Sequence, residues 1–360
     1  MTKNEPAKLK SEKPKAEVKA EKKAAKQERK ALSKTVKKAK AETKAITKVS
    51  PQKSQRVSRS NRRHQSEAYV HLSDMIQQGK AIAAGKAAPP NMPKRLPVVL
   101  VHGVNARDES ITRSDLWGRI PDVLRANGFS VWFGNQDSWG TVEDNAHHIA
   151  QTILTVLEKT EADQVHIVAH SKGGLDSRRA VHLPELEGKI ASLTTLATPV
   201  RGLKFCDMLA KSKVIIPHVV KHFVNLGASM KGDEDPKSWD VLQALTTEGS
   251  AEIIHENPDL PTIVYRSYAF VPETEGLKAP NIGGMIIGLY DGHNDGIVPL
   301  WSAGNEYLVV TRVKGHGGYT HDDCIDQRER SFTVRMPDDT VYPTVPDFVL
   351  SIMKEVDDKV

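Results

Sequence analysis

The stretch VHIVAHSKGGLDSRRA, residues 165–180, decides the fold of this chain. Its first half is a nearly continuous apolar run of the kind that forms a fully buried strand, and its second half has a helical composition. Ser171 stands at the junction of the two halves. A serine in such a strand-to-helix turn is either a nucleophile or an ordinary helix cap, so its neighbours must decide between the two.

Small residues surround Ser171 on both sides. Ala169 lies two positions before it and Gly173 two positions after it, followed by Gly174. A nucleophile elbow holds its central residue in strained backbone angles, and strand and helix approach each other closely only where these positions are small. The pattern favours a nucleophilic serine, with Ala169 where such an elbow usually has glycine.

Two backbone amides are candidates for an oxyanion hole, the pair of donors that stabilises a tetrahedral intermediate. Lys172 follows the serine at a helix N-terminus, where free N–H groups favour negative charge. His102 and Gly103 end an earlier apolar run, and the loop after them presents the Val104 amide. The alternative for this second site is a plain turn at the end of a strand.

Apolar runs and helical stretches alternate along the rest of the chain, which predicts a mostly parallel sheet with helices on both faces. The expected strands lie within 97–103, 129–134, 164–170, 190–199, 261–270 and 306–313, and the expected helices within 115–128, 141–160 and 173–183. Thr141 and Asp144 resemble a capping box at the start of the second helix. Residues 200–260 are rich in helix formers and too long for one crossover, so we expect an inserted helical cap.

Charge divides the chain into two parts. Residues 1–64 hold 22 Lys or Arg and 6 Asp or Glu, a formal charge of +16, whereas the remaining 296 residues carry −10. We expect a basic, Lys/Ala-rich disordered tail over 1–64, a linker and domain entry over 65–96, and a catalytic domain over 97–360. The tail either binds an anionic surface, such as nucleic acid, a membrane or a granule, or only keeps the protein in solution.

The chain shows no secretory signal and no apolar run long enough to span a bilayer, so we expect a cytoplasmic protein without a transmembrane segment. Cys206 and Cys324 are its only cysteines, and we expect two buried thiols.

Several motifs occur in an order known from one enzyme family. They are VVLVHG, TVEDNAHHIAQTILTVLEKTEADQVHIVAHSKGG, TLATPVRG, LTTEGSAEII and HNDGIVP. Over about residues 97–330 the chain resembles the bacterial triacylglycerol lipases and esterases of the α/β-hydrolase superfamily. The resemblance implies an α/β-hydrolase fold with the helical insertion as a lid, and hydrolysis of carboxylic esters.

An α/β-hydrolase triad follows the chain order serine, acid, histidine. The family pattern NDGIVP puts the acid at Asp295; Asp291 is the competing carboxylate, for which we favour turn chemistry with Gly292. For the base, the order His321, Asp323, Gln327 is similar to the lipase segment that carries the catalytic histidine, and His316 is the alternative. We expect structural or surface roles for His102, His147, His148, His166 and His170.

The resemblance also implies a structural calcium ion near the histidine, although the chemistry requires no cofactor. Asp323 matches a carboxylate ligand and Gln327 a main-chain carbonyl ligand, with Glu273 and Glu275 as loosely aligned candidates for the second carboxylate. Calcium takes six to eight oxygen ligands. The alternative is that Asp323 and Asp326 only cap the following helix.

The sequence thus predicts acyl transfer from an ester through an acyl-enzyme on Ser171. The alternative is a binding protein of the same fold with little or no activity, tethered to a polyanionic surface by the basic tail.

Overall fold

The structure is a computed structural model. It describes residues 59–89, 95–104, 106–211, 236–272, 287–288, 290–304, 307–313, 320–329 and 332–360, which all belong to one compact unit. Residues 1–58, the greater part of the predicted basic tail, lie outside the described residues.

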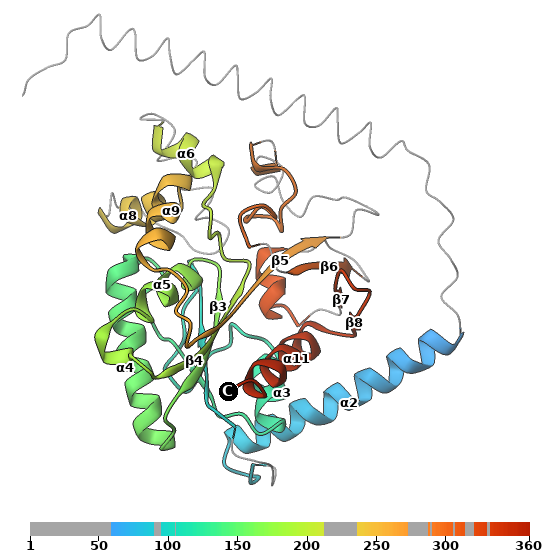
Figure 1. Ribbon diagram of the computed structural model, residues 1–360. Coiled ribbons are helices and arrows are strands. Elements are labelled where there is room, and N and C mark those ends of the chain that lie inside the picture. Colours follow the sequence, from blue (N-terminus) through green and yellow to red (C-terminus); the bar gives the residue numbers. More distant parts are fainter. Residues whose placement is uncertain are drawn as a thin grey trace, which may run out of the picture. The chain divides into compact units, whose positions relative to one another are not determined.

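A single mixed sheet runs through this unit (Figure 1), and in the described part of the chain it has eight strands in the order β2-β1-β3-β4-β5-β6-β7-β8. The strands are β1 (Val98–Val101), β2 (Val131–Phe133), β3 (Val165–His170), β4 (Ile190–Leu196), β5 (Val264–Pro272), β6 (Tyr307–Val313), β7 (Phe332–Arg335) and β8 (Val341–Tyr342). Strands β1 to β6 pair in parallel, whereas β7 and β8 add an antiparallel edge. The prediction of a mostly parallel sheet is therefore confirmed.

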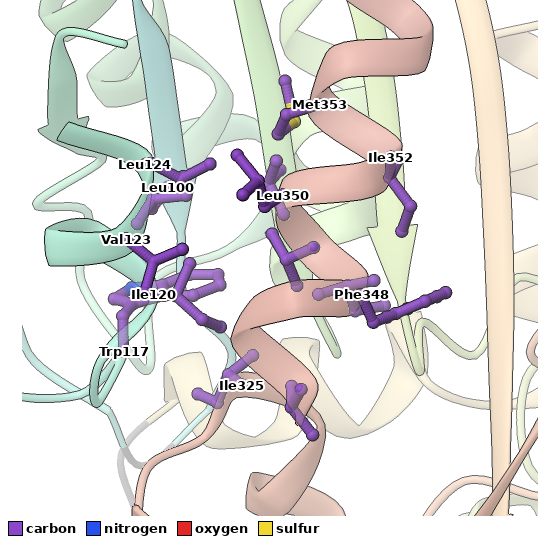
Figure 2. Packing of buried hydrophobic residues seen from close by; sticks show 14 of the residues in the cluster. Leu100, Trp117, Ile120, Val123, Leu124, Ile325, Phe348, Leu350, Ile352 and Met353 are labelled. Atoms are coloured by element: carbon purple, nitrogen blue, oxygen red, sulfur yellow. The ribbon is translucent and has the colours of Figure 1, made fainter. Parts of the chain in front are cut away.

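Helices cover both faces of the sheet. They are α2 (Arg59–Ala83), α3 (Ile120–Ala126), α4 (Val142–Thr160), α5 (Gly173–Ala180), α6 (Lys204–Lys211), α8 (Pro236–Ala244), α9 (Thr247–Glu256) and α11 (Val345–Asp357), with short 3-10 turns η1 (Pro184–Leu186) and η2 (His321–Ile325). Alternate residues of β1 separate the two layers: Leu100 packs with α3 and α11, and Val99 with α4 and α5. Figure 2 shows the first cluster, to which Leu100 of β1, Leu124 of α3 and Met353 of α11 contribute.

Helix α4 begins as its sequence predicts. The Thr141 hydroxyl accepts a hydrogen bond from the Asp144 amide at 3.0 Å, which satisfies a backbone donor of the first turn. Ile149 and Ile153 on one face of the helix are completely buried. This face packs on the sheet and fixes the layer beneath β3.

Helix α2 occupies residues assigned above to the tail and the linker. Leu72 and Met75 are buried in the cluster that contains α3, and a Cβ on Gly79 would lie 2.0 Å from the Asp122 carbonyl oxygen. The difference has a physical reason: this helix has only a narrow apolar stripe, and its stability comes from packing on α3 rather than from its own composition.

The segment between β4 and β5 carries α6, α8 and α9, and its residues 212–235 lie outside the described part. Phe205 and Leu209 of α6 form a small apolar cluster with Leu242 of α8 and Ile287. A helical insertion is present as expected, while its action as a lid stays a prediction. None of the described helices is both long and apolar enough to cross a bilayer.

Candidate active site

Ser171 lies in a sharp turn between β3 and α5. Its φ of +55° falls in the left-handed region, where a residue with a side chain is strained by about 1–3 kcal/mol. The Ser171 amide donates to the Leu196 carbonyl of β4 at 3.0 Å, which anchors the turn at the carboxyl end of the sheet. This geometry is that of a nucleophile elbow.

Glycines let the turn pack this closely. A Cβ on Gly173 would lie 2.2 Å from the His102 carbonyl oxygen and 2.8 Å from that of Val101, both at the carboxyl end of β1. A Cβ on Gly174 would lie 2.1 Å from the Thr198 hydroxyl. The small residues around the serine are thus required by close contact with β1 and with the end of β4.

The loop after β1 lies directly against the serine. A Cβ built on Gly103 would be 2.6 Å from the Ser171 Cβ and 3.2 Å from its Oγ. The Gln136 side chain donates to the His102 carbonyl at 2.7 Å and so helps to hold the loop after β1 in place. Val104 follows Gly103 and Lys172 follows Ser171, so the structure brings both predicted oxyanion segments next to the serine.

His321 and Asp295 form a buried hydrogen bond of 2.8 Å between Nδ1 and Oδ2. The other oxygen of Asp295 accepts from the amides of Ile297 at 3.0 Å and Val298 at 2.8 Å, so the carboxylate is held in one orientation. The His321 Nε2 is buried and makes no hydrogen bond to any described residue. It is therefore available to a substrate or to a neighbouring hydroxyl.

His170, the residue before Ser171, contacts the ring of His321. The rings of His170 and His321 lie 4.5 Å apart between centroids. Burial and the neighbouring His321 lower the pKa of His170 well below its usual value. Burial opposes the charged form of His321, but the charge and hydrogen bond of Asp295 outweigh it and raise the pKa of His321 above 6.5. His321 is thus the ring that gains a proton more readily.

Asp291, the competing acid, is occupied elsewhere. Its two oxygens accept from the amides of Lys204 and Phe205, each at 3.0 Å, at the N-terminus of α6. Its side chain caps this distant helix instead of making the local turn with Gly292 that the sequence suggested. His316, the competing base, lies outside the described residues.

The environment of Asp323 does not fit a calcium ion. One oxygen accepts from the Arg328 Nε at 2.9 Å, and the other accepts from Arg328 Nη2 and from the Thr320 amide at 2.7 Å. These donors occupy the carboxylate oxygens that would bind a cation. The Thr320 contact caps the start of η2, in line with the capping role that the sequence offered as the alternative for Asp323. No cluster of three metal-ligating side chains occurs among the described residues, and Glu273 and Glu275 lie outside them. Gln327 is described, and no group of three His, Cys, Asp or Glu side chains that could hold a metal ion with it occurs in the described part of the chain.

Sequence reasoning missed a buried polar network beside the elbow. The fully buried Lys172 side chain donates to Asp176 at 2.7 Å, and Asn145 of α4 donates to the other Asp176 oxygen at 2.9 Å. Breaking a buried pair of this kind costs about 3–5 kcal/mol. The network ties α5, and hence the Lys172 amide, to α4; the i, i+4 spacing of Lys172 and Asp176 was its one signal in the sequence.

A second serine–histidine–aspartate array lies on the same sheet. His166 of β3 bonds to the Ser192 hydroxyl at 2.7 Å and to Asp357 of α11 at 3.1 Å. Ser192 and His166 are completely buried, and Ser192 lies inside a regular strand with no left-handed turn. Because Ser192 is buried within a strand, a substrate cannot reach its hydroxyl, and the array provides a natural control for the site at Ser171.

Part of the chain is similar to known lipases. Residues 95–200 match the family of class 2 lipases. A triacylglycerol lipase of Burkholderia plantarii is 31% identical over 51% of this chain and 52% of its own length, and one of Pseudarthrobacter phenanthrenivorans is 31% identical over 47% and 54%. Over these residues the chain is similar to bacterial lipases. It spans about half the length of these two curated lipases.

Two solved structures show the same fold. The mature form of the lipase BlEst2 of Bacillus licheniformis superposes with a TM-score of 0.51 at 20% identity, covering 68% of this chain and 92% of that one. The metagenomic carboxyl esterase MGS0156 gives a TM-score of 0.50 at 18% identity over 77% and 82%. The predicted α/β-hydrolase fold is confirmed.

Proposed function

We propose that this lipase relative hydrolyses carboxylic esters through an acyl-enzyme on Ser171. The observation that carries the proposal is the left-handed Ser171 elbow with the Asp295–His321 pair beside it, the His321 ring lying 4.5 Å from that of His170. A serine is too weak an acid to attack unaided, and an oriented imidazole supplies the base it needs.

The reaction runs in two halves. Ser171 attacks the ester carbonyl while the His321 Nε2 takes the hydroxyl proton, and the resulting imidazolium is stabilised by Asp295. The amides of Val104 and Lys172 stabilise the oxyanion, and each such donor contributes about 10²–10³ in rate. His321 then protonates the leaving alcohol and later activates the water that releases the acid.

The raised pKa of His321 supports this division of labour. In the resting enzyme the base must be neutral, and in the transition state it must hold a proton next to the Asp295 carboxylate. The hydrogen bond from His321 to Asp295, which raises the pKa of His321, therefore stabilises the protonated ring in the transition state. His170, kept neutral by burial, adds no second positive charge beside it.

The substrate class follows from the relatives. The two curated relatives are named triacylglycerol lipases, which supports acylglycerol or simpler acyl esters as substrates. A lid role for the α6, α8 and α9 insertion and a cytoplasmic location remain part of the proposal. Binding of an anionic surface by residues 1–64 also stays a prediction, which deletion of residues 1–58 would test. The deletion stops at residue 58 because α2 starts at Arg59 and packs on the domain.

Hydrolysis of p-nitrophenyl butyrate by matched variants tests the proposal. Ser171→Ala removes the nucleophile and is expected to abolish turnover, since loss of a triad member leaves only about 10³–10⁴-fold catalysis over water. Ser192→Ala removes the serine of the second array and should leave turnover within twofold or so of the wild type.

Melting temperatures of both variants separate chemistry from folding. Residual turnover in Ser171→Ala at the wild-type level, or its loss in a folded Ser192→Ala, would refute the assignment. A wild-type protein that cleaves no ester of an acyl-length series would favour the binding-protein alternative.

A further inference from the structure

We infer that Arg119 positions the loop that carries His321. The sequence resemblance assigns the task of holding this loop in place to a structural calcium ion. The inference rests on the proposed function, because the loop matters through the histidine. Residues 320–329 are called the histidine loop below.

The histidine loop turns at a strained corner. After η2 the chain reverses at Asp326, whose φ of +60° is left-handed, and Glu329 follows at +48°. Residues with a side chain adopt this region reluctantly, so contacts from outside must hold the corner.

Arg119, just before α3, supplies those contacts. Its backbone amide and its Nε donate to Asp326 Oδ2 at 3.0 and 2.7 Å, and its Nη2 donates to Oδ1 at 2.5 Å. The Asp326 side chain is 1% exposed and that of Arg119 is 11% exposed. A planar guanidinium that meets a carboxylate with two nitrogens fixes direction as well as distance, which an ammonium group cannot do.

The same two segments also meet through their apolar neighbours. Ile325, next to Asp326, belongs to the buried cluster that holds Trp117 and Ile120 on either side of Arg119 (Figure 2). A Cβ on Gly118 would lie 2.1 Å from the Asp326 carbonyl oxygen. The apolar packing brings the two segments together, and the Arg119–Asp326 ion pair fixes the orientation of the turn at Asp326.

Asp323 is the second buried carboxylate of the histidine loop, and it too is matched by an arginine. Arg328 and Thr320 occupy both of its oxygens. Since Arg328 belongs to the loop, this pair closes the loop on itself. Arg119 comes from outside the loop, so its ion pair with Asp326, together with the packing of Ile325, sets the position of the loop relative to the sheet.

The corner is coupled to the histidine over a short distance in the chain. The Cys324 thiol donates to the His321 carbonyl at 3.0 Å, and Asp326 donates its amide to the Asp323 carbonyl at 3.1 Å. A shift of the corner therefore displaces His321 relative to Asp295. Because Arg119 touches no reacting atom, it is a positioning residue, and its loss should lower kcat with little change in KM.

Two substitutions and one control test the inference with the full-length protein. Arg119→Ala removes the guanidinium group that contacts Asp326 with two nitrogens, and Arg119→Lys keeps the positive charge without this bidentate contact. Arg179→Ala is the control, because Arg179 of α5 makes a bidentate pair of 2.7 and 2.9 Å with Glu143 of α4, and neither residue belongs to the histidine loop. With p-nitrophenyl butyrate, Arg119→Ala should lose about 10–100-fold in kcat, the penalty typical of a misplaced group, and Arg179→Ala less than about twofold.

Guanidinium ion provides the rescue arm. At about 20 mM its denaturing effect is small, since that effect scales with concentration, yet it fills the space left in Arg119→Ala. We expect partial recovery of kcat with guanidinium and none with equal sodium chloride. If Arg119→Ala does not fold, Arg119→Lys decides: an unchanged kcat overturns the inference, and a lowered kcat with unchanged KM supports it.

Hydrogen exchange of the loop amides gives a readout that does not depend on activity. Amides of residues 320–329 should exchange about tenfold faster in Arg119→Ala and unchanged in Arg179→Ala, because local opening is set by local contacts. If wild-type turnover fails to depend on Ser171, the proposed function is wrong while this readout still tests the loop. Wild-type exchange together with wild-type kcat in Arg119→Ala would overturn the inference.

Discussion

Replacing Asp295 by asparagine tests the proposed catalytic pair through the tautomer of His321. In the native site Asp295 Oδ1 accepts two backbone amides, from Ile297 and Val298, while Oδ2 accepts from the His321 Nδ1. An asparagine oxygen must keep the two amide donors, so its NH₂ group takes the place of Oδ2. There it donates to Nδ1, and the neutral ring then carries its proton on Nε2, where it can no longer accept one from Ser171.

The expected loss is large because the base is removed and not merely weakened. A forced wrong tautomer costs about 10⁴ in kcat, which corresponds to about 5 kcal/mol of transition-state stabilisation. Folding should change little, because asparagine is nearly isosteric and both amide contacts of Oδ1 survive. The assay is kcat and KM for p-nitrophenyl butyrate, with the melting temperature measured alongside.

Asp291→Asn is the matched control four residues earlier. Its carbonyl oxygen still accepts from one amide at the N-terminus of α6, so we expect a small loss of stability, about 1 kcal/mol, and turnover near the wild type. Less than a tenfold loss of kcat in Asp295→Asn, or an equal loss in Asp291→Asn, would refute the assignment of the acid.

Three further predictions follow from the site. Gly173→Ala forces a Cβ to 2.2 Å from the His102 carbonyl, so it should cost about 1–3 kcal/mol and lower kcat together with the melting temperature; a variant as stable and active as the wild type would show that the elbow is not this tight. Because the pKa of His321 is raised and the neutral ring is the base, kcat/KM should fall as pH drops through a midpoint above 6.5, and a midpoint well below that value would contradict the Asp295 contact. Because Arg328 fills the oxygens of Asp323, a chelator such as EGTA should change neither turnover nor melting temperature, and a loss restored by calcium would contradict this account.

Much of the fold could be predicted because its strands are apolar on both faces. The pattern of VHIVAH and its neighbours indicates a buried parallel strand, and the glycines after Ser171 allow close packing against the end of β1 and the residues after β4. Helix α2 could not be predicted in this way, since Leu72 and Met75 become informative only once α3 lies beside them.

The site was less accessible to sequence reasoning for a different reason. Asp291 and Asp295 are the same residue type in one loop, and only the placement of α6 shows that Asp291 is already occupied by two backbone amides. Likewise, Asp323 matches a ligand position in sequence, but its partner is an arginine five residues later in the same loop. Side-chain partners depend on the meeting of segments that local patterns do not specify.

The central claim, that Ser171 is an activated nucleophile, is tested most directly by peptide mapping after reaction with a fluorophosphonate. Such a reagent modifies a serine whose proton is taken by an oriented histidine. The account predicts one adduct, on the peptide that contains Ser171, that disappears in Asp295→Asn, and none on the peptide that contains Ser192. An unmodified Ser171 in the folded wild-type protein would contradict it.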